Sequence, residues 1–284
     1  MSKMEILKVK SESVICVGDL HGNFGSLIQL LKSYDIKNTL LIICGDIGMG
    51  FHKPVYYEQV FSKIKKELSK RDSYIYCIRG NHDDPNMFNS DAFKDNRMRT
   101  LRDYTVIQCI DPNDENIVSN ILAIGGATSI DRTDRLYKMQ AKTLKYLRFH
   151  PNALYREAEK QYVEYWDNEQ PVYDDKALSE LKEKGLFIDM VCTHTCPHFC
   201  KPITKEGIQH WILADEHLSA DLDHERQTMT NIYERLKTDG HIIKKWIYGH
   251  YHFHNMEYIN DTQFTLLDME RNGIFDHIEI LRYA

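Results

Sequence analysis

A set of polar residues able to bind metal ions or transfer protons follows closely after apolar runs of the sequence. These residues are Asp19, His21, Asp46, Asn81, His82, His194, His250 and His252. They provide carboxylate oxygens, a carboxamide and imidazole nitrogens but no thiolate, and such donors suit Mn, Fe, Zn or similar divalent ions. Two ions about 3.5–4 Å apart, joined by a carboxylate, stabilise both the attacking and the leaving oxygen of a phosphoryl displacement.

The elements that must position these residues alternate between strand and helix in the first half of the chain. Short apolar runs closed by glycine predict buried strands at residues 14–17, 39–44 and 74–78. Helical spacing of apolar residues follows at 24–34, with Asn23 as the N-cap, and at about 54–70. Parallel strands joined by crossover helices end at one edge of a sheet, so we expect the polar residues to meet there.

The second half of the chain predicts a further sheet with helices around it. Apolar runs lie at residues 104–110, 117–118, 121–124, 187–192 and 242–248, with closing antiparallel strands at 254–259, 263–267 and 274–281. Helical patterns lie at about 133–147, 174–184 and 215–237. We therefore predict an α/β core with two sheets. No linker or repeat marks a boundary, which favours a single domain over 1–284 with cap-like insertions at about 127–185 and 201–240.

Composition and charge narrow the class of protein. A net charge of −6 argues against general binding to nucleic acid or to an anionic membrane surface. The sequence has neither an apolar leader nor an apolar run of membrane-spanning length. Of the seven cysteines, Cys16, Cys44 and Cys77 lie inside strand-like runs, where thiols behave as small apolar groups. These features predict a reduced, cytoplasmic protein without a membrane partner.

The spacing of the motifs resembles the calcineurin-like metallophosphoesterases. The blocks that carry the resemblance are Gly18-Asp19-x-His21-Gly22-Asn23, Gly45-Asp46, Gly80-Asn81-His82-Asp83, His194 after a strand, and Gly249-His250-x-His252. They stand in the family's order and span most of the chain. The resemblance implies a four-layer α/β/β/α sandwich, with two central mixed sheets flanked by helices and a two-metal site at the strand ends.

The resemblance also implies the ligands and the reaction. One ion would be held by Asp19, His21, Asp46 and His252, and the other by Asp46, Asn81, His194 and His250. A hydroxide bridging the two ions would attack a phosphate ester, and His82 would protonate the leaving oxygen, oriented by Asp83 or Asp84. We expect manganese as the pair of cofactor ions, with Fe, Zn, Ni and Mg as alternatives.

One block departs from the phosphoprotein phosphatases of this superfamily. Those enzymes continue the second block as Gly-Asp-x-x-Asp-Arg-Gly, whereas this chain reads Gly45-Asp46-Ile47-Gly48-Met49-Gly50-Phe51. Without that Asp-Arg pair, the sequence offers three candidates for a phosphate-binding arginine, Arg79, Arg132 and Arg135. For each of them the alternative role is a structural ion pair. The departure favours a small phosphate ester or a nucleotide as substrate over a phosphoprotein.

Other interpretations of the sequence remain open. The run from Cys192 to Cys200 suggests a separate zinc site, and it also offers His198 in place of His194 as a ligand. His254 lies two residues beyond His252 on the same side of a strand. Among functions, a phosphodiesterase or nuclease, a phosphoprotein phosphatase and a metal-bound scaffold without catalysis are the alternatives to a phosphatase of small molecules. The sequence leaves the oligomeric state open.

Overall fold

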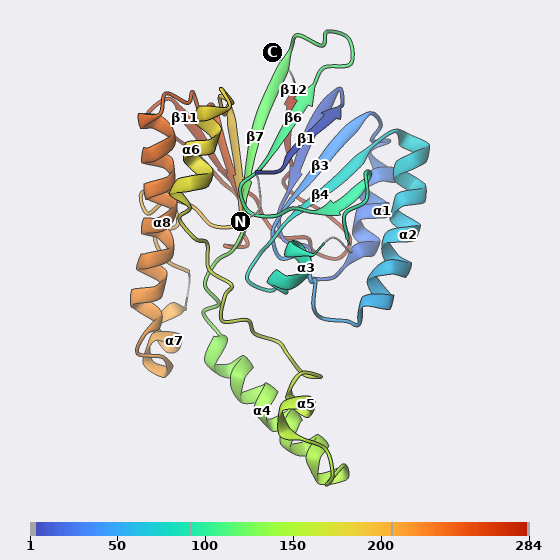
Figure 1. The fold of residues 1–284 in the computed structure, drawn as a ribbon, viewed down its shortest axis with the longest axis vertical. Helices are drawn as coiled ribbons and strands as arrows, with labels where there is room; N and C mark the ends of the chain where they lie inside the picture. The colour runs from blue at the N-terminus through green and yellow to red at the C-terminus, as the bar shows by residue number, and fades with distance from the viewer. Residues whose placement is uncertain (1–3, 91–92, 206, 283–284) are drawn as a thin grey trace.

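Two β-sheets stacked face to face form the centre of the protein, seen in a computed structural model that describes residues 4–90, 93–205 and 207–282 (Figure 1). In order across the sheet, the five-stranded sheet contains β12 (Glu279–Arg282), β2 (Ser13–Val17), β3 (Thr39–Cys44), β4 (Tyr74–Ile78) and β5 (Met98–Thr100). The seven-stranded sheet contains β1 (Ile6–Lys10), β6 (Thr105–Ile110), β7 (Val118–Ile124), β8 (Met190–Thr193), β9 (Lys245–Tyr248), β11 (Thr262–Leu266) and β10 (Asn255–Ile259).

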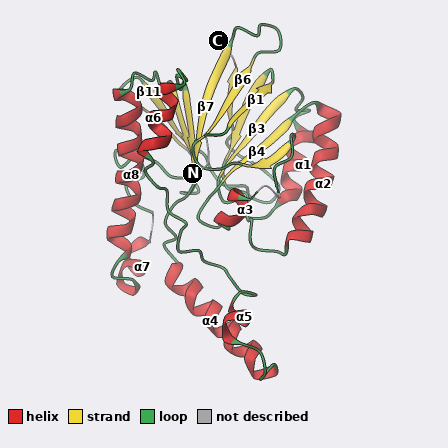
Figure 2. Cartoon of the chain, viewed as in Figure 1, coloured by secondary structure: helices red, strands yellow, loops and turns green. Residues whose placement is uncertain are grey.

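Helices cover the outer faces of both sheets, as Figure 2 shows in red on either side of the yellow strands. The described helices are α1 (Phe24–Ser33), α2 (Pro54–Arg71), α3 (Pro85–Asn89), α4 (Arg132–Phe149), α5 (Tyr155–Glu159), α6 (Asp175–Glu183), α7 (Ile208–Ala214) and α8 (Leu218–Thr238). Among the described residues, no helix is both long and apolar enough to cross a membrane.

The packing of β3 shows why the sheets are buried on both faces. Its alternate residues Leu41 and Ile43 pack in the cluster that includes the apolar faces of α1 and α2. Leu40 and Ile42 point the other way, into the cluster between the sheets. A third cluster joins the seven-stranded sheet to α6 and α8. Successive side chains of a strand point to opposite faces, so continuous apolar runs suit a layer covered on both sides. The predicted four-layer α/β/β/α sandwich is confirmed.

The helices of the two predicted insertions have different surroundings. Leu178 and Leu181 of α6, and Met229 and Ile232 of α8, pack on the seven-stranded sheet and form part of its outer layer. The helices α4 and α5 instead extend away from the sandwich at the bottom of Figure 1. The ranges 127–185 and 201–240 therefore contain layer-forming helices as well as projecting ones.

Several strands differ from the sequence expectations. The short runs at 117–118 and 121–124 belong to one strand, β7. The strand β1 was not expected, because lysines alternate with its apolar residues and it lies at the edge of the sheet, paired only with β6. The closing strand β12 pairs with β2 in the five-stranded sheet, whereas β10 pairs with β11 in the other.

Candidate metal centre

The carboxyl ends of neighbouring parallel strands from both sheets bring the candidate ligands together. In the five-stranded sheet β2, β3 and β4 lie side by side and parallel, and they lead into the loops with Asp19 and His21, with Asp46, and with Asn81 and His82. In the seven-stranded sheet β8 and β9 are parallel neighbours that lead into His194 and into His250 and His252. Because the sheets stack face to face, their loops meet at one edge.

The first group of donors comprises Asp19, His21, Asp46 and His252, whose ligand atoms all lie within 4.8 Å of one another. The Nε2 atoms of His21 and His252 are 3.2 Å apart. His252 Nε2 lies 3.0 Å from Asp19 Oδ2. These are the residues that the resemblance implies for one ion.

The second group comprises Asp46, His194 and His250, again with ligand atoms within 4.8 Å of one another. His194 Nε2 lies 3.4 Å from Asp46 Oδ1 and 3.0 Å from Asn81 Oδ1, so the Asn81 carboxamide oxygen faces the same point. Asp46 belongs to both groups, as a bridging carboxylate must.

Backbone hydrogen bonds hold the two carboxylates rigidly between loops. The amides of Leu20 and His21 donate to the carbonyl of Asp46, at 3.0 and 2.7 Å. The amide of His82 donates to Asp46 Oδ1 at 2.7 Å, and that of His250 donates to Asp19 Oδ1 at 3.0 Å. Each donor comes from a different loop than its acceptor, so the loops position one another's ligands.

Close approach between these loops explains two glycines of the motifs. A Cβ at Gly80 would lie 2.0 Å from Asp46 Oδ1, and one at Gly249 would lie 2.4 Å from Asp19 Oδ1. Only glycine allows both contacts. His21, Asp46, His250 and His252 have positive φ angles, a conformation that non-glycine residues rarely adopt and that clusters at functional sites.

The charges of the buried groups favour a cation at this point. Burial alone would raise the pKa of Asp46, but His194 and His82 outweigh it and hold this pKa well below its usual value. Burial would likewise lower the pKa of His194, yet Asp46 and Asp19 raise it to about 9. Both carboxylates are therefore ionised, and they draw positive charge to a site that is buried from solvent.

The donor atoms also fit a divalent metal ion in their bonding. Asp19 Oδ2 is buried and accepts no hydrogen bond, although His252 lies beside it. The facing nitrogens of His21 and His252 can share at most one proton between them. Unpaired oxygen and nitrogen lone pairs converging beside two carboxylates match the donor preferences of Mn, Fe or Zn.

A chain of hydrogen bonds behind the second group was not expected from the sequence. Asn81 Nδ2 donates to Ser129 Oγ at 2.9 Å, and Ser129 donates through Oγ and its amide to the two oxygens of Glu169, each at 2.6 Å. Burial raises the pKa of Glu169 to about 8, which the two bonds from Ser129 partly oppose. The only sequence signal is the Gly125–Ser129 run after a strand; Glu169 has none.

Asp83 has other partners than those expected. Its Oδ1 accepts from the amides of Gly48 and Met49 and its Oδ2 from those of Ile47 and Gly80, at 2.8 to 3.2 Å. Both oxygens are thus engaged by the loop that follows Asp46, and neither orients His82. Asp84 caps α3 through the amide of Asn86. We therefore assign Asp83 to holding the loop in place rather than to catalysis. The pKa of Asp83 is raised to about 7, mainly by burial and secondly by the negative charge of Asp46.

His82 lies at the open side of the metal centre beside Arg135 of α4. Its side chain is 24% exposed, and its Nε2 is 3.8 Å from Asp46 Oδ2. Arg135 Nη2 lies 2.9 Å from His82 Nδ1, while Arg135 Nε donates to Asp131 at 2.8 Å. Burial lowers the pKa of His82 to about 4; Asp46 opposes this change and Arg135 adds to it.

The other two candidate arginines are engaged elsewhere. Arg79 is 5% exposed, and its guanidinium donates to Asp103 and to backbone carbonyls at residues 168–170. Arg132 binds Asp215 and Asp221, each at 2.6 Å at its closest. The structure shows an ion pair for all three arginines, since Arg135 also pairs with Asp131 and is 7% exposed. Of the three, Arg135 is the one that lies beside His82 at the metal centre.

The remaining sequence candidates lie outside the two donor groups. His198 Nδ1 is 2.7 Å from Thr230 Oγ1 on α8, and the ring of His254 stacks on His277. Among the described residues, no group able to hold a metal includes Cys196 or Cys200. Cys16, Cys44 and Cys192 do form one such group, but hydrogen bonding with Cys192 and burial keep the pKa of Cys16 high, which favours apolar packing.

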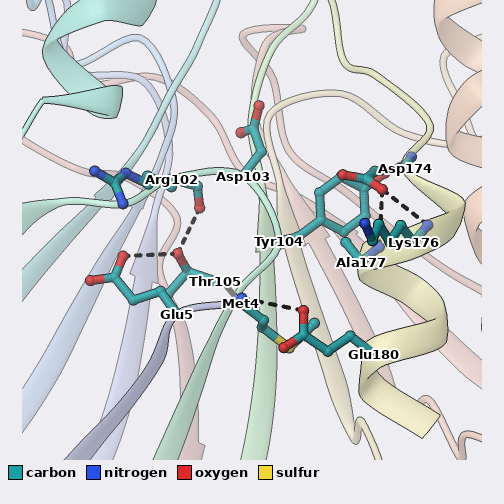
Figure 3. Close-up of a pocket in the computed structure, with 10 residues that line it drawn as sticks. All are labelled: Met4, Glu5, Arg102, Asp103, Tyr104, Thr105, Asp174, Lys176, Ala177 and Glu180. Atoms are coloured by element: carbon teal, nitrogen blue, oxygen red, sulfur yellow. Dashed lines mark hydrogen bonds between the residues drawn. The ribbon is translucent and has the colours of Figure 1, made fainter. Parts of the chain in front are cut away.

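A hollow of about 270 Å³ lies between the start of β6 and α6, apart from the metal centre (Figure 3). Its polar groups have partners inside and outside the hollow, since Thr105 donates to the carbonyl of Arg102, the amide of Met4 donates to Glu180, and Asp103 accepts from Arg79. Asp174 caps α6 through the amides of Lys176 and Ala177. The hollow therefore offers no converging set of donors comparable with the metal centre.

A two-sheet sandwich with Asp and His residues converging at its strand ends has the form of a metal-dependent hydrolase. Residues 13–254 match the family model Metallophos, described as calcineurin-like phosphoesterase, and the chain belongs to this family of metal-dependent hydrolases. The resemblance drawn from the motifs is confirmed.

Individual relatives are more distant. Over 84 residues the chain is 32% identical to Shewanella-like protein phosphatase 1 of Plasmodium berghei (strain Anka), a match that covers 26% of this chain and 23% of that protein. The solved structure of a dimetal phosphatase from Danio rerio covers 90% of this chain and 87% of its own at 13% identity and a TM-score of 0.47. GAP50, the anchor in the inner membrane complex of Plasmodium, covers 89% and 70% at 14% identity and a TM-score of 0.43.

Proposed function

We propose that this protein hydrolyses phosphate esters with two divalent metal ions bound at the candidate metal centre. The observation that carries the proposal is the pair of donor groups that share Asp46, buried except for the partly exposed His21 and His252. One ion is assigned to Asp19, His21, Asp46 and His252, and the other to Asp46, Asn81, His194 and His250. Manganese is the proposed ion, because the donors are oxygen and nitrogen without sulfur.

Bound divalent ions supply an activated water near neutral pH and neutralise charge on the phosphate. Arg135 is proposed to donate hydrogen bonds to phosphate oxygens, since its guanidinium is the cation beside His82. His82 is proposed to protonate the leaving oxygen. Burial holds the pKa of this imidazole at about 4, which favours its neutral form, and a phosphate dianion beside it would raise that pKa toward the protonated form.

The proposed substrate is a small phosphate ester or a nucleotide. The support is the absence of the Asp-Arg pair from the block at 45–51, together with the position of Arg135 on a helix that extends beyond the sandwich. Hydrolysis of diesters or nucleic acid, and of phosphoproteins, are outcomes that the experiment below distinguishes.

The test uses metal-stripped protein with and without added Mn²⁺, assayed on p-nitrophenyl phosphate and bis-p-nitrophenyl phosphate. We expect metal-dependent cleavage of the monoester and none by Asp46→Asn, because Asp46 serves both donor groups. Asp223→Asn, the same change at an exposed position of α8, is the matched control. Preference for the diester would move the assignment to a phosphodiesterase. Two bound ions with no turnover of either ester would leave a highly selective enzyme or a scaffold.

We also propose a reducing, cytoplasmic setting for the protein. All seven cysteines are free and buried, which is typical of proteins kept reduced. When the protein is unfolded in the presence of an alkylating agent, every cysteine should react, because every cysteine is reduced. Recovery of a disulfide would contradict the proposal.

A further inference from the structure

An exposed aromatic ring lies at the edge of the metal centre. Phe51 is 42% exposed, and its ring centroid lies 6.5 Å from that of His82 in an edge-on arrangement. The ring of His82 is in turn 5.0 Å from that of His21. A large apolar side chain is thus presented to solvent beside the residue that, under the proposed function, protonates the leaving group.

The loops beneath this ring are shaped to hold it. A Cβ on Gly48 would lie 3.2 Å from the Phe51 ring, and one on Gly22 would lie 3.5 Å from it. The ring therefore rests on the two loops that carry His21 and Asp46, and at Gly48 the fit is tight enough that a side chain there would have to shift the ring. Gly48 also has a φ of +88°, which disfavours other residues there.

A second contact holds the same loop from the side of the α4–α5 region. A Cβ on Gly50 would lie 2.6 Å from the indole of Trp166, so the indole packs directly against the backbone preceding Phe51. The amide of Gly50 donates to the hydroxyl of Tyr57 at 2.9 Å. Phe51 is therefore an exposed ring on an anchored loop, and its exposure is a built feature of the site.

His82 has both a cation and an apolar ring beside it. Arg135 contacts His82 with a charged guanidinium that suits phosphate oxygens, and Phe51 contacts it with an apolar ring edge. A phosphate ester placed between them meets a cation at its phosphate and a ring at its leaving group. Aromatic rings pair favourably in edge-to-face or offset arrangements, and an aromatic leaving group makes use of this.

We propose, resting on the proposed function, that Phe51 is a specificity-determining residue that binds a planar aromatic ring in the leaving group of the phosphate ester. The shared chemistry is the ring, which occurs either directly on the ester oxygen, as in an aryl phosphate, or further along, as in a nucleotide.

The experiment compares kcat/KM of the Mn²⁺-loaded wild type and Phe51→Leu on phenyl phosphate, AMP and ribose 5-phosphate. Hydrolysis of AMP and of ribose 5-phosphate breaks the same kind of ester bond, and the two substrates differ by the base that AMP carries. For phenyl phosphate, the intrinsic reactivity cancels in the ratio of variant to wild type. Phe149→Leu, at a 74% exposed ring on the far end of α4, is the matched control.

We expect Phe51→Leu to lower kcat/KM about tenfold more on a ring-bearing ester than on ribose 5-phosphate, and Phe51→Trp to restore the difference. A loss of kcat/KM on phenyl phosphate identifies the substrate as an aryl ester, and a loss on AMP identifies it as a nucleotide. As a binding measurement, phenylphosphonate should inhibit the wild type more strongly than methylphosphonate, and Phe51→Leu should remove that difference.

Equal losses on all three esters would overturn the role of Phe51 while leaving the phosphatase assignment intact. Where the loss falls on phenyl phosphate, equal inhibition by the two phosphonates would overturn it as well. Absence of turnover by the metal-loaded wild type would instead contradict the proposed function itself. The two failures are therefore distinguishable.

Discussion

The loops at the strand ends and the segment at residues 131–170 contribute to the site in different ways. The loops carry the candidate ligands, which are buried except for the partly exposed His21 and His252, and amides from neighbouring loops donate to the two carboxylates. The segment includes α4 and α5, which extend beyond the sandwich, and it reaches the site through side chains such as Arg135 and Glu169. Under the proposed function, the loops would bind the metal ions and the segment would adjust substrate binding and ligand orientation.

Substitution of a loop carboxylate should have the largest effect. Asp19→Asn removes one donor of the first group only, so we expect the bound metal to fall from two ions to one. Turnover should fall on the order of 1,000-fold, since an ion supplies several kcal/mol of transition-state stabilisation. Metal analysis and kcat/KM measure both effects, with Asp223→Asn as control. Full occupancy in Asp19→Asn would contradict the assignment of Asp19 as a ligand.

Substitution of Arg135 tests whether the segment acts on substrate rather than on metal. Arg135→Ala should lower kcat/KM about 100-fold, as removal of a charge-stabilising donor commonly does, with two ions still bound. Arg135→Lys should recover only part of the loss, because a lysine lacks the planar pair of donors. Arg148→Ala, on the exposed last turn of α4, is the matched control. Loss of metal from Arg135→Ala would remove the distinction between the two regions.

The hydrogen-bond chain behind Asn81 links the two regions, and Ser129→Ala breaks it. Ser129 joins the Asn81 carboxamide to Glu169 of the segment, so its loss should weaken binding of one ion by about 10- to 100-fold. Calorimetric metal titration provides the measurement. Ser129→Thr should retain the hydroxyl and much of the affinity, and Ser119→Ala on β7 is the control for the same chemical change. Unchanged affinity would show that Asn81 is oriented without this chain.

The last prediction concerns a different quantity, the pH dependence of folding stability at Glu169. Its pKa of about 8 in the folded protein lies above its ordinary value, so the folded state binds a proton that the unfolded state has released. The contribution of Glu169 to the free energy of unfolding is present at low pH. It is lost as the pH rises toward 8, by up to about 1.4 kcal/mol per pH unit. Denaturation of metal-free protein at several pH values should show this fall relative to Glu169→Gln. Parallel curves for both proteins would contradict it.

Much of the fold was predictable because its signals are local. The continuous apolar residues of β3 and β4 are buried on both faces, and each run stops at or just before a glycine that begins a polar loop. Edge strands were harder to predict, since the lysines of β1 interrupt its apolar pattern and its pairing with β6 involves distant residues. The same limit applies to β12, whose sheet depends on a partner near the other end of the chain.

The sequence by itself determined the identity and order of the candidate ligands. Asp19, Asp46, Asn81, His194 and His250 each stand in a short motif whose glycines and apolar run are adjacent in the chain. Parallel strands then place these motifs at one edge whatever the details of the packing. For the ligands, local pattern and topology were sufficient to predict that they meet.

Only the tertiary structure decided the tasks of the surrounding residues. Arg132 and Arg135 are three residues apart on the same helix, and no local feature of the sequence distinguishes them. In the structure Arg135 lies beside His82, whereas Arg132 binds Asp215. The Asp83 carboxylate accepts from the amide of Gly48 in the loop after Asp46 and from that of Gly80 in its own loop, although His82 is its neighbour in the chain. The physical reason is that a charged side chain binds whichever partners the folded chain brings within reach, and those partners lie far away in the sequence.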